Sequence, residues 1–354
     1  MGAGTARGGA CLLISGNVRK NMEFVVFAGV LLLLFIFMIV QELIQTKNQE
    51  KLFKKYLREN YGKEPPKEYS LERFARLGSY LERHKEEKQL DDITWNDLGM
   101  DEVFRRIDRT YSAAGEEYLY YTLRNISCGR EAMEHLEEVV NWLQEQEDIK
   151  VRIQLLMKRL GHLGKYSLYD YLDNLDYLGE RSNRKIVLGN LLYLPFLLLL
   201  FVQPAMGTIG IVLCMLWHIM TYFREKKVIE PYIISFAYVL RLIDVCEELE
   251  KQKIPVYRRE LDELREVLKS LRELRRGSYW VMAGNQGKIG GNPLDILADY
   301  LRMILHLDIF QFNRMLEKLR KKTGQVETML AITGYLDMAI SVGGFRKSLE
   351  GYCI

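Results

Sequence analysis

Two stretches of the chain are hydrophobic throughout and contain no Asp, Glu, Lys or Arg, namely residues 24–40 and 186–223. The first is just long enough for one helix to span a bilayer, and Leu43 and Ile44 extend it. A secretory signal peptide is the alternative, but such a peptide ends in a small-residue cleavage site, and the polar segment that follows contains none. We therefore predict a transmembrane anchor over residues 22–44.

The second hydrophobic stretch is too long for one membrane helix. Gln203-Pro204 interrupts it near the middle, so the pattern predicts two helices, about 186–202 and 205–223, joined by a very short uncharged turn. A buried helical hairpin in a large soluble core is the alternative. A core helix normally has a polar face, however, and residues 197–202 offer none. We therefore predict a transmembrane hairpin over residues 186–223.

Apolar residues recur at three- and four-residue steps over most of the remaining chain, which is the spacing of an amphipathic helix. The clearest example, at about 228–252, has apolar residues at Ile229, Ile233, Phe236, Leu240 and Ile243. A charged helix at about 257–276, a long helix at about 293–320 and a final helix at about 325–340 follow. No segment alternates convincingly with the period of two that a half-buried strand requires. The sequence therefore predicts an all-α protein with long helices.

Basic residues gather near the ends of the predicted membrane segments. One cluster follows the first segment and two flank the second: Lys47, Lys51, Lys54, Lys55 and Arg58; Arg181, Arg184 and Lys185; Arg224, Lys226 and Lys227. All three clusters are cytoplasmic if the N-terminus lies outside, in agreement with the positive-inside rule. We therefore expect residues 41–185 and 224–354 to face the cytoplasm at a bacterial plasma membrane.

The composition agrees with a charged soluble part attached to membrane segments. The chain has 354 residues, of which 48% are hydrophobic and 27% charged, with a net charge of +3. The separation of charge from the two apolar stretches excludes a soluble single-domain enzyme, and the apolar content excludes a disordered chain. Residues 1–21 are Gly-rich and aperiodic, so we expect a flexible tail, with Met22 a plausible alternative start. Residues 45–89 are polar and are predicted to form a helical linker.

The sequence shows no catalytic residue, cofactor-binding site or metal site. The segment from Gly284 to Lys288 resembles a phosphate-binding loop, but Met282 replaces the first glycine and Ile289 replaces the hydroxyl residue that must reach magnesium. The five cysteines and five histidines have neither disulfide-framework nor metal-ligand spacing. His218 falls in the second half of the predicted hairpin, where one polar residue near an interface is more often tolerated than functional.

A cluster of basic and aromatic residues lies where the charged helix is predicted to end. They are Arg272, Arg275, Arg276, Tyr279, Trp280 and Lys288. Such a cluster suits contact with a nucleic-acid backbone. A solvated helix end is the alternative, because cations are favourable beside the C-terminal end of the helix dipole.

Two segments of the sequence have distinctive motifs. Residues 107–119 read Ile-Asp-Arg-Thr-Tyr-Ser-Ala-Ala-Gly-Glu-Glu-Tyr-Leu, and residues 332–341 read Ile-Thr-Gly-Tyr-Leu-Asp-Met-Ala-Ile-Ser. The first resembles the start of the helical core domain of the DNA mismatch repair MutS family, and the second resembles the closing helix of that core. The motif positions are Thr110, Gly115, Leu119, Leu336 and Asp337. Residues 90–124 look most like membrane-anchored, MutS-related bacterial proteins, and the resemblance extends over about 90–354.

The resemblance implies an all-α core and lever domain that the transmembrane hairpin interrupts. Residues 90–185 would form the first part of the core, and residues 224–354 would form the lever helices and the end of the core. The break at 277–292 would occupy a clamp-like tip that contacts double-stranded DNA. ATP and magnesium are implied only for the family's ATPase domain, whose Walker A motif this sequence does not contain, and the mismatch-reading domain is also missing.

Three hypotheses follow from these patterns. The first is a membrane-tethered MutS-related module that binds DNA and couples to a MutS-like ATPase partner, or that forms a homodimer. The second is a membrane scaffold that binds a protein partner without DNA binding or catalysis, which the near-neutral net charge favours. The third is an enzyme cut short, for example by a truncated or split gene.

Overall fold

The computed structural model describes residues 30, 33, 36–41, 43–63, 71–86, 88–126, 129–163, 167–275, 293–349 and 351. The chain divides into two compact units, Met1–Tyr56 and Leu57–Ile354. The described residues of the first unit are helical, and several of their large apolar side chains are exposed, including Leu33, Phe37, Val40, Leu43 and Ile44. The predicted tail over 1–21 and much of the predicted anchor over 22–44 lie outside the described residues.

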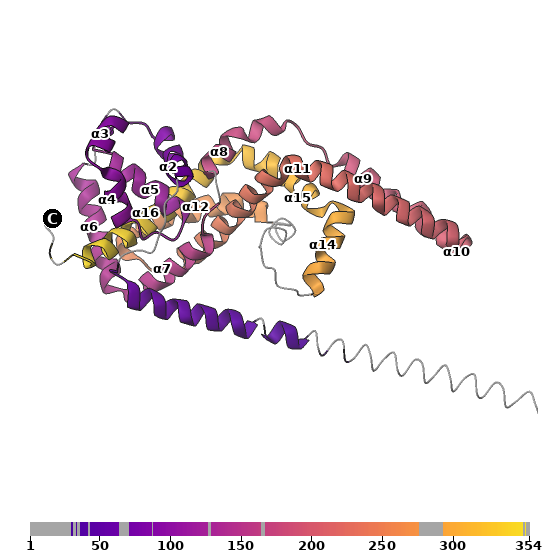
Figure 1. The fold of residues 1–354 in the computed structure, drawn as a ribbon, viewed down its shortest axis with the longest axis horizontal. Coiled ribbons are helices and arrows are strands. Elements are labelled where there is room, and N and C mark those ends of the chain that lie inside the picture. Colours follow the sequence, from indigo (N-terminus) through magenta and orange to yellow (C-terminus); the bar gives the residue numbers. More distant parts are fainter. Residues whose placement is uncertain are drawn as a thin grey trace, which may run out of the picture. The chain divides into compact units, whose positions relative to one another are not determined.

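The second unit is almost entirely helical, as the sequence predicts (Figure 1). Its elements are α2 Leu71–Arg83, α3 Asp92–Asp97, α4 Met100–Ile107, α5 Ala113–Arg124, α6 Arg130–Glu145, α7 Glu147–Leu160, α8 Leu168–Asp173, the 3₁₀ helix η1 Asn174–Leu178, α9 Arg184–Leu191, α10 Tyr193–Val202, α11 Pro204–Glu250, the 3₁₀ helix η2 Pro255–Tyr257, α12 Arg258–Arg275, α14 Pro293–Leu305, α15 Leu307–Arg320 and α16 Thr323–Lys347. Within the described residues no strand forms, and one isolated bridge pairs Gln89 with Asn125.

Helix α16 lies at the centre of the core, where it packs against α5, α6, α7 and α12. Residues on all sides of it are buried, including Val326, Met329, Leu330, Leu336, Ala339 and Ile340. A helix that is surrounded by other helices needs apolar residues all round. For this reason α16 is apolar enough to cross a membrane by composition, although 72% of its most apolar window is buried within the protein.

Two other helical segments are long and apolar enough to span a membrane, and both leave most of their apolar surface exposed. They are Arg184–Val202, which contains α9 and α10, and Pro204–Glu230, which is the first part of α11. Only 6% and 28% of their most apolar windows are buried. The two segments pack side by side around the turn at Gln203 (Figure 1). Because exposed apolar surface on this scale is unfavourable in water, these segments indicate membrane association.

Helix α11 contains part of the exposed apolar pair and also part of the buried core. It contains 47 residues and is therefore about 70 Å long. Met206, Leu213 and Met220 in its first half are exposed, whereas Phe236 and Leu249 in its second half are buried in the core. The sequence predicts a separate helix at 228–252, but the structure continues one helix through that boundary, because the charged residues at 224–227 are themselves good helix formers.

The predicted long helix at 293–320 is wrong, because the structure breaks it into α14 and α15 at His306. His306 has a φ of 54° and is the single non-glycine residue with a positive φ among the described residues. Apolar spacing continues through this point, so the pattern gives no indication of the break. A histidine in this conformation is strained and persists only where its surroundings hold it.

Candidate functional site

The two segments that resemble the MutS family lie against each other, although they are 226 residues apart in sequence. Asp337 of α16 is fully buried and receives hydrogen bonds from the residues that precede α5. The backbone N–H groups of Tyr111 and Ser112 donate to its carboxyl at 3.0 and 2.8 Å, and the Ser112 hydroxyl donates at 2.6 Å. Ser112 is also the N-cap of α5 and accepts from the Gly115 N–H at 3.1 Å. One carboxyl therefore fixes the start of α5 on α16.

The other motif residues complete this junction. Gly115 lies so close to Asp337 that a Cβ at this position would come within 2.7 Å of the Asp337 Cγ. Thr110 donates to Asp108 from both its N–H and its hydroxyl, and the side chains of Leu119 and Leu336 are buried. Gly115 and Asp337 thus meet at the α5–α16 contact, Leu119 and Leu336 are buried on the same two helices, and Thr110 is hydrogen-bonded within the segment that precedes α5.

Two adjacent glutamates on α5 extend the buried polar residues beneath this junction. Glu116 pairs with the buried Arg76 at 2.7 Å, and Glu117 accepts a hydrogen bond from Ser167 at 2.9 Å. Burial raises the pKa of Glu117 to about 8, because removal from water penalises the ionised carboxylate. Glu117 is therefore largely protonated in the folded protein at neutral pH.

The predicted nucleic-acid cluster is described only in part. Arg272 lies on the last turns of α12 and is exposed, and Arg275 is the last residue of that helix. Arg276, Tyr279, Trp280 and Lys288 lie outside the described residues.

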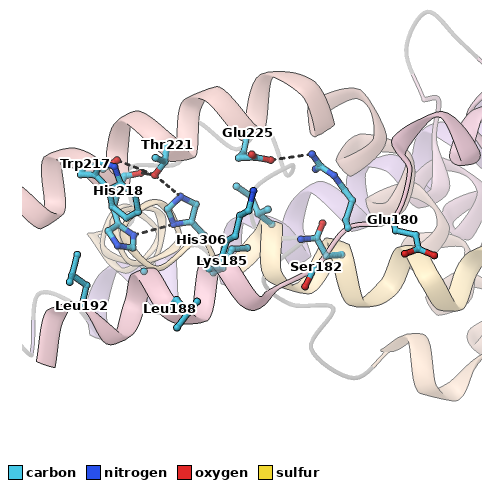
Figure 2. Close-up of a pocket in the computed structure, with 15 residues that line it drawn as sticks. Glu180, Ser182, Lys185, Leu188, Leu192, Trp217, His218, Thr221, Glu225 and His306 are labelled. Carbon is cyan, nitrogen blue, oxygen red and sulfur yellow. Dashed lines mark hydrogen bonds and ion pairs between the residues drawn. The ribbon is translucent and has the colours of Figure 1, made fainter.

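A separate cavity of about 690 Å³ lies where α9 and α11 meet the start of α15 (Figure 2). Its lining is apolar toward α10 and becomes charged in the opposite direction. The residues that line it include Glu180, Arg181, Lys185, Leu188, Gly189, Leu192, Trp217, His218, Thr221, Glu225, His306 and Asn313. Arg181 donates to Glu225 at 3.1 Å, and this ion pair joins α11 to the segment that precedes α9. The predicted membrane-helix ends therefore enclose a polar site.

Two buried histidines from distant parts of the chain meet in this cavity. The Nδ1 atoms of His218 and His306 are 3.3 Å apart, and His306 Nε2 lies 3.4 Å from the Thr221 hydroxyl. His218 is 1% exposed and His306 is 5% exposed. Burial, reinforced by His218, lowers the pKa of His306 to about 4, so this ring is neutral at pH 7. The strained backbone of His306 places its ring in this contact (Figure 2).

A second polar group supports the start of α15. Tyr222 donates to the carboxyl of Asp308 at 2.8 Å, and Lys226 donates to the Tyr222 hydroxyl at 3.0 Å. Burial raises the pKa of Asp308 above its usual range, an effect that the hydrogen bond from Tyr222 opposes. These contacts connect α11 to the turn that carries His306.

Sequence reasoning identified His218 as an intramembrane polar residue but assigned it no partner. Its contact with His306 joins residues 88 positions apart, and no spacing rule relates such residues. Among the described residues no three His, Cys, Asp or Glu side chains gather in a geometry that could hold a metal ion. Comparison of the chain with protein-family models, with curated proteins and with solved structures found no match.

Proposed function

We propose that this chain is a membrane-inserted, MutS-related core and lever module that couples a bilayer-embedded hairpin to a cytoplasmic partner. The single observation that carries the proposal is the continuity of α11. One helix is exposed and apolar over Pro204–Glu230 and then enters the core, where Ile233, Phe236 and Leu249 are buried. A movement of the hairpin is therefore transmitted to the core without an intervening flexible loop.

The dimensions of the hairpin fit a bilayer. The helix from Gln203 to Arg224 is about 30 Å long, which equals the thickness of the hydrocarbon core. Arg184 and Lys185 lie at the same end as Arg224 because the two segments are antiparallel. The cationic end faces the cytoplasm under the positive-inside rule, and Gln203 lies at the opposite surface.

We propose that this membrane is a bacterial plasma membrane and that the N-terminal anchor also spans it. A protease added to right-side-out vesicles that contain the full chain tests this orientation. The C-terminal region, followed with an antibody to a C-terminal tag, is expected to remain protected until the vesicles are opened. Cleavage in sealed vesicles contradicts the orientation.

The resemblance supports double-stranded DNA as the cytoplasmic ligand and an ATPase domain, in the same or another polypeptide, as the functional partner. The described end of the predicted DNA cluster carries Arg272 and Arg275 on α12. ATP and magnesium belong to the ATPase domain in this proposal. The core then links the hairpin, the DNA-binding end of α12 and the ATPase through α11, α12 and α16.

The DNA proposal is tested with the full chain in nanodiscs and a fluorescent duplex. We expect binding that weakens as salt rises. The slope of the logarithm of the binding constant against the logarithm of the salt concentration is expected to become shallower by about 0.9 for each phosphate contact removed. Arg272→Ala, Arg275→Ala and Arg276→Ala together are expected to weaken binding at least tenfold. Arg258→Ala with Arg259→Ala is the control, because these exposed arginines begin the same helix at its other end. Equal loss in both variants, or no binding at low salt, contradicts the DNA proposal.

A protein scaffold is the second candidate, and the net charge of +3 over 354 residues favours it. Dedicated DNA-binding domains are generally more basic. Crosslinking of the full chain in cells, followed by identification of both nucleic acid and protein, separates the two candidates. Recovery of one dominant protein partner without DNA supports the scaffold.

A further inference from the structure

The cavity between α9, α11 and α15 has the polarity profile of a lipid site, and this inference rests on the proposed membrane insertion. Leu188, Leu192 and Trp217 line the end toward α10, and the charged residues lie away from it (Figure 2). His218 is only a few residues before Arg224, where the hairpin leaves the hydrocarbon in the proposed orientation. The cavity therefore opens at the depth of phospholipid headgroups.

His218 presents a polar atom to this cavity that no described residue contacts. Its Nε2 is buried without a hydrogen-bond partner among the described residues, although the ring is 1% exposed. Gly189 lines the same cavity, and a Cβ there would lie 3.3 Å from this Nε2. A buried polar atom without a partner costs about 1–3 kcal/mol, so an unpaired nitrogen facing a cavity favours a ligand there.

The contact between the two histidines determines whether this nitrogen acts as a donor or as an acceptor. The Thr221 hydroxyl donates to the Trp217 and His218 carbonyl oxygens at 3.0 and 2.9 Å. In that arrangement His306 Nε2–H donates to Thr221, His218 Nδ1–H donates to His306 Nδ1, and His218 Nε2 is a bare acceptor. If the Thr221 hydroxyl turns to His306 Nε2 instead, His306 Nδ1–H donates to His218 Nδ1, and His218 carries its proton on Nε2. An anionic oxygen in the cavity selects the donor arrangement.

Other atoms around the cavity also lack partners. Arg181 uses one nitrogen for Glu225, and its Nη1 is buried without a partner among the described residues. Asn313 donates to Asn183 at 2.9 Å, and its Oδ1 is likewise buried and unpartnered. Lys185 is exposed at the cavity wall. The site thus offers both donors, for an anionic oxygen, and an acceptor, for an N–H or O–H group.

The charges of the lining indicate a ligand with no net charge. Arg181 and Lys185 are balanced by Glu180 and Glu225. An anionic headgroup would leave one negative charge uncompensated, whereas a zwitterion matches both signs. The donors suit a phosphate, and Asn313 Oδ1 with the two carboxylates suits a primary ammonium group. A quaternary ammonium has no N–H to donate.

We propose that this cavity binds a zwitterionic phospholipid with a primary amine headgroup. Its phosphate lies between Lys185 and His218 Nε2, and its ammonium donates toward Asn313 and the glutamates. An acyl chain follows Leu188, Leu192 and Trp217 into the bilayer. The lipid satisfies the unpaired groups and holds the turn at His306 against the hairpin.

The test uses the full chain, purified in detergent and examined by native mass spectrometry with added lipids. Phosphatidylethanolamine is expected to bind at least fivefold more than phosphatidylcholine, which has the same net charge but no N–H, and more than anionic phosphatidylglycerol. Lys185→Ala and His218→Phe are each expected to lower phosphatidylethanolamine binding at least fivefold. Arg184→Ala is the matched control, because this adjacent exposed cation does not line the cavity.

Three results overturn the proposal: equal binding of phosphatidylethanolamine and phosphatidylcholine, equal loss in Arg184→Ala and Lys185→Ala, or equal competition by soluble glycerophosphoethanolamine. The last result assigns the site to a free phosphodiester. Extraction of vesicles with alkaline carbonate separates this failure from that of membrane insertion. A chain that stays in the membrane without the amine preference refutes the lipid site alone, and a chain that is extracted refutes the insertion.

Discussion

Two buried polar clusters in the second unit differ in how completely their atoms are paired. Around Asp337, two backbone N–H groups and one hydroxyl converge on a single carboxyl. Around His218, the ring Nε2 and the nearby Asn313 Oδ1 have no partner within the described part of the chain. A paired cluster stabilises a fold, whereas an unpaired one that borders a cavity lowers stability unless a ligand completes it. The difference distinguishes a structural junction from a binding site.

The largest expected effect comes from removal of the Asp337 carboxyl. Asp337→Ala removes the carboxyl that accepts from the Tyr111 and Ser112 N–H groups and from the buried Ser112 hydroxyl, so we expect a loss of about 3–5 kcal/mol of unfolding free energy. Denaturant unfolding of the full chain in detergent measures this loss. Asp337→Asn keeps one acceptor oxygen and is expected to lose less. A loss below 1 kcal/mol for Asp337→Ala would show that the junction is not structural.

A smaller effect is expected at Gly115, where Gly115→Ala places a methyl group against the Asp337 side chain. Overpacking of this kind costs about 1–3 kcal/mol. Gly78→Ala is the control, because this helical glycine in α2 has no atom within 4 Å of the position of a Cβ. The control is expected to be neutral or to stabilise by up to about 1 kcal/mol through helix propensity. Similar losses in both variants would contradict the packing argument.

The Asp337 junction and the helical pair around Gln203 show which features of the fold the sequence could predict. The all-α class follows from apolar spacing, and the exposed helical pair follows from an uncharged apolar stretch that Gln203-Pro204 interrupts. Both are local properties of the sequence. The meeting of Ser112 with Asp337 does not, because spacing fixes which face of a helix is buried but not which helix covers it. The family resemblance paired these segments without stating their contact.

The missed features have a similar cause. Apolar spacing continues through His306, so the break between α14 and α15 could not be detected, and the contact of His306 with His218 depends on that break. The continuity of α11 was missed because the charged residues at 224–227 resemble a membrane boundary. They mark a boundary of environment, and the helix itself continues through it.

The pH dependence of stability tests the buried polar residues of α5, next to the Asp337 junction. Glu117 keeps its proton in the folded state up to a pKa of about 8, whereas the unfolded carboxyl ionises near 4.5. Between these values the folded state binds more protons, so stability present at low pH is lost as pH rises from about 4.5 to 8. We expect the melting temperature to fall on the order of 5 °C over this range.

Glu117→Gln is expected to flatten this dependence, because glutamine stays neutral and still accepts from Ser167. Melting curves of the full chain in detergent at pH 5, 6.5 and 8 make the comparison. Glu116→Gln is not a suitable control, since Glu116 pairs with the buried Arg76. The exposed Glu138→Gln on α6 serves instead. An unchanged slope in Glu117→Gln would assign the pH dependence to other groups.

The smallest effect on stability without lipid is expected at His218. His218→Phe keeps an aromatic ring beside Tyr193 and Trp217 and removes a polar atom that lacks a partner. It also removes the acceptor or donor that faces His306 Nδ1, so the two changes offset each other to within about 1 kcal/mol in lipid-free detergent. With phosphatidylethanolamine present, the wild-type chain gains stability by mass action, and the variant does not. A variant that is strongly destabilised without lipid would place His218 in the same structural class as Asp337, because its loss would then break a satisfied cluster rather than empty a binding site.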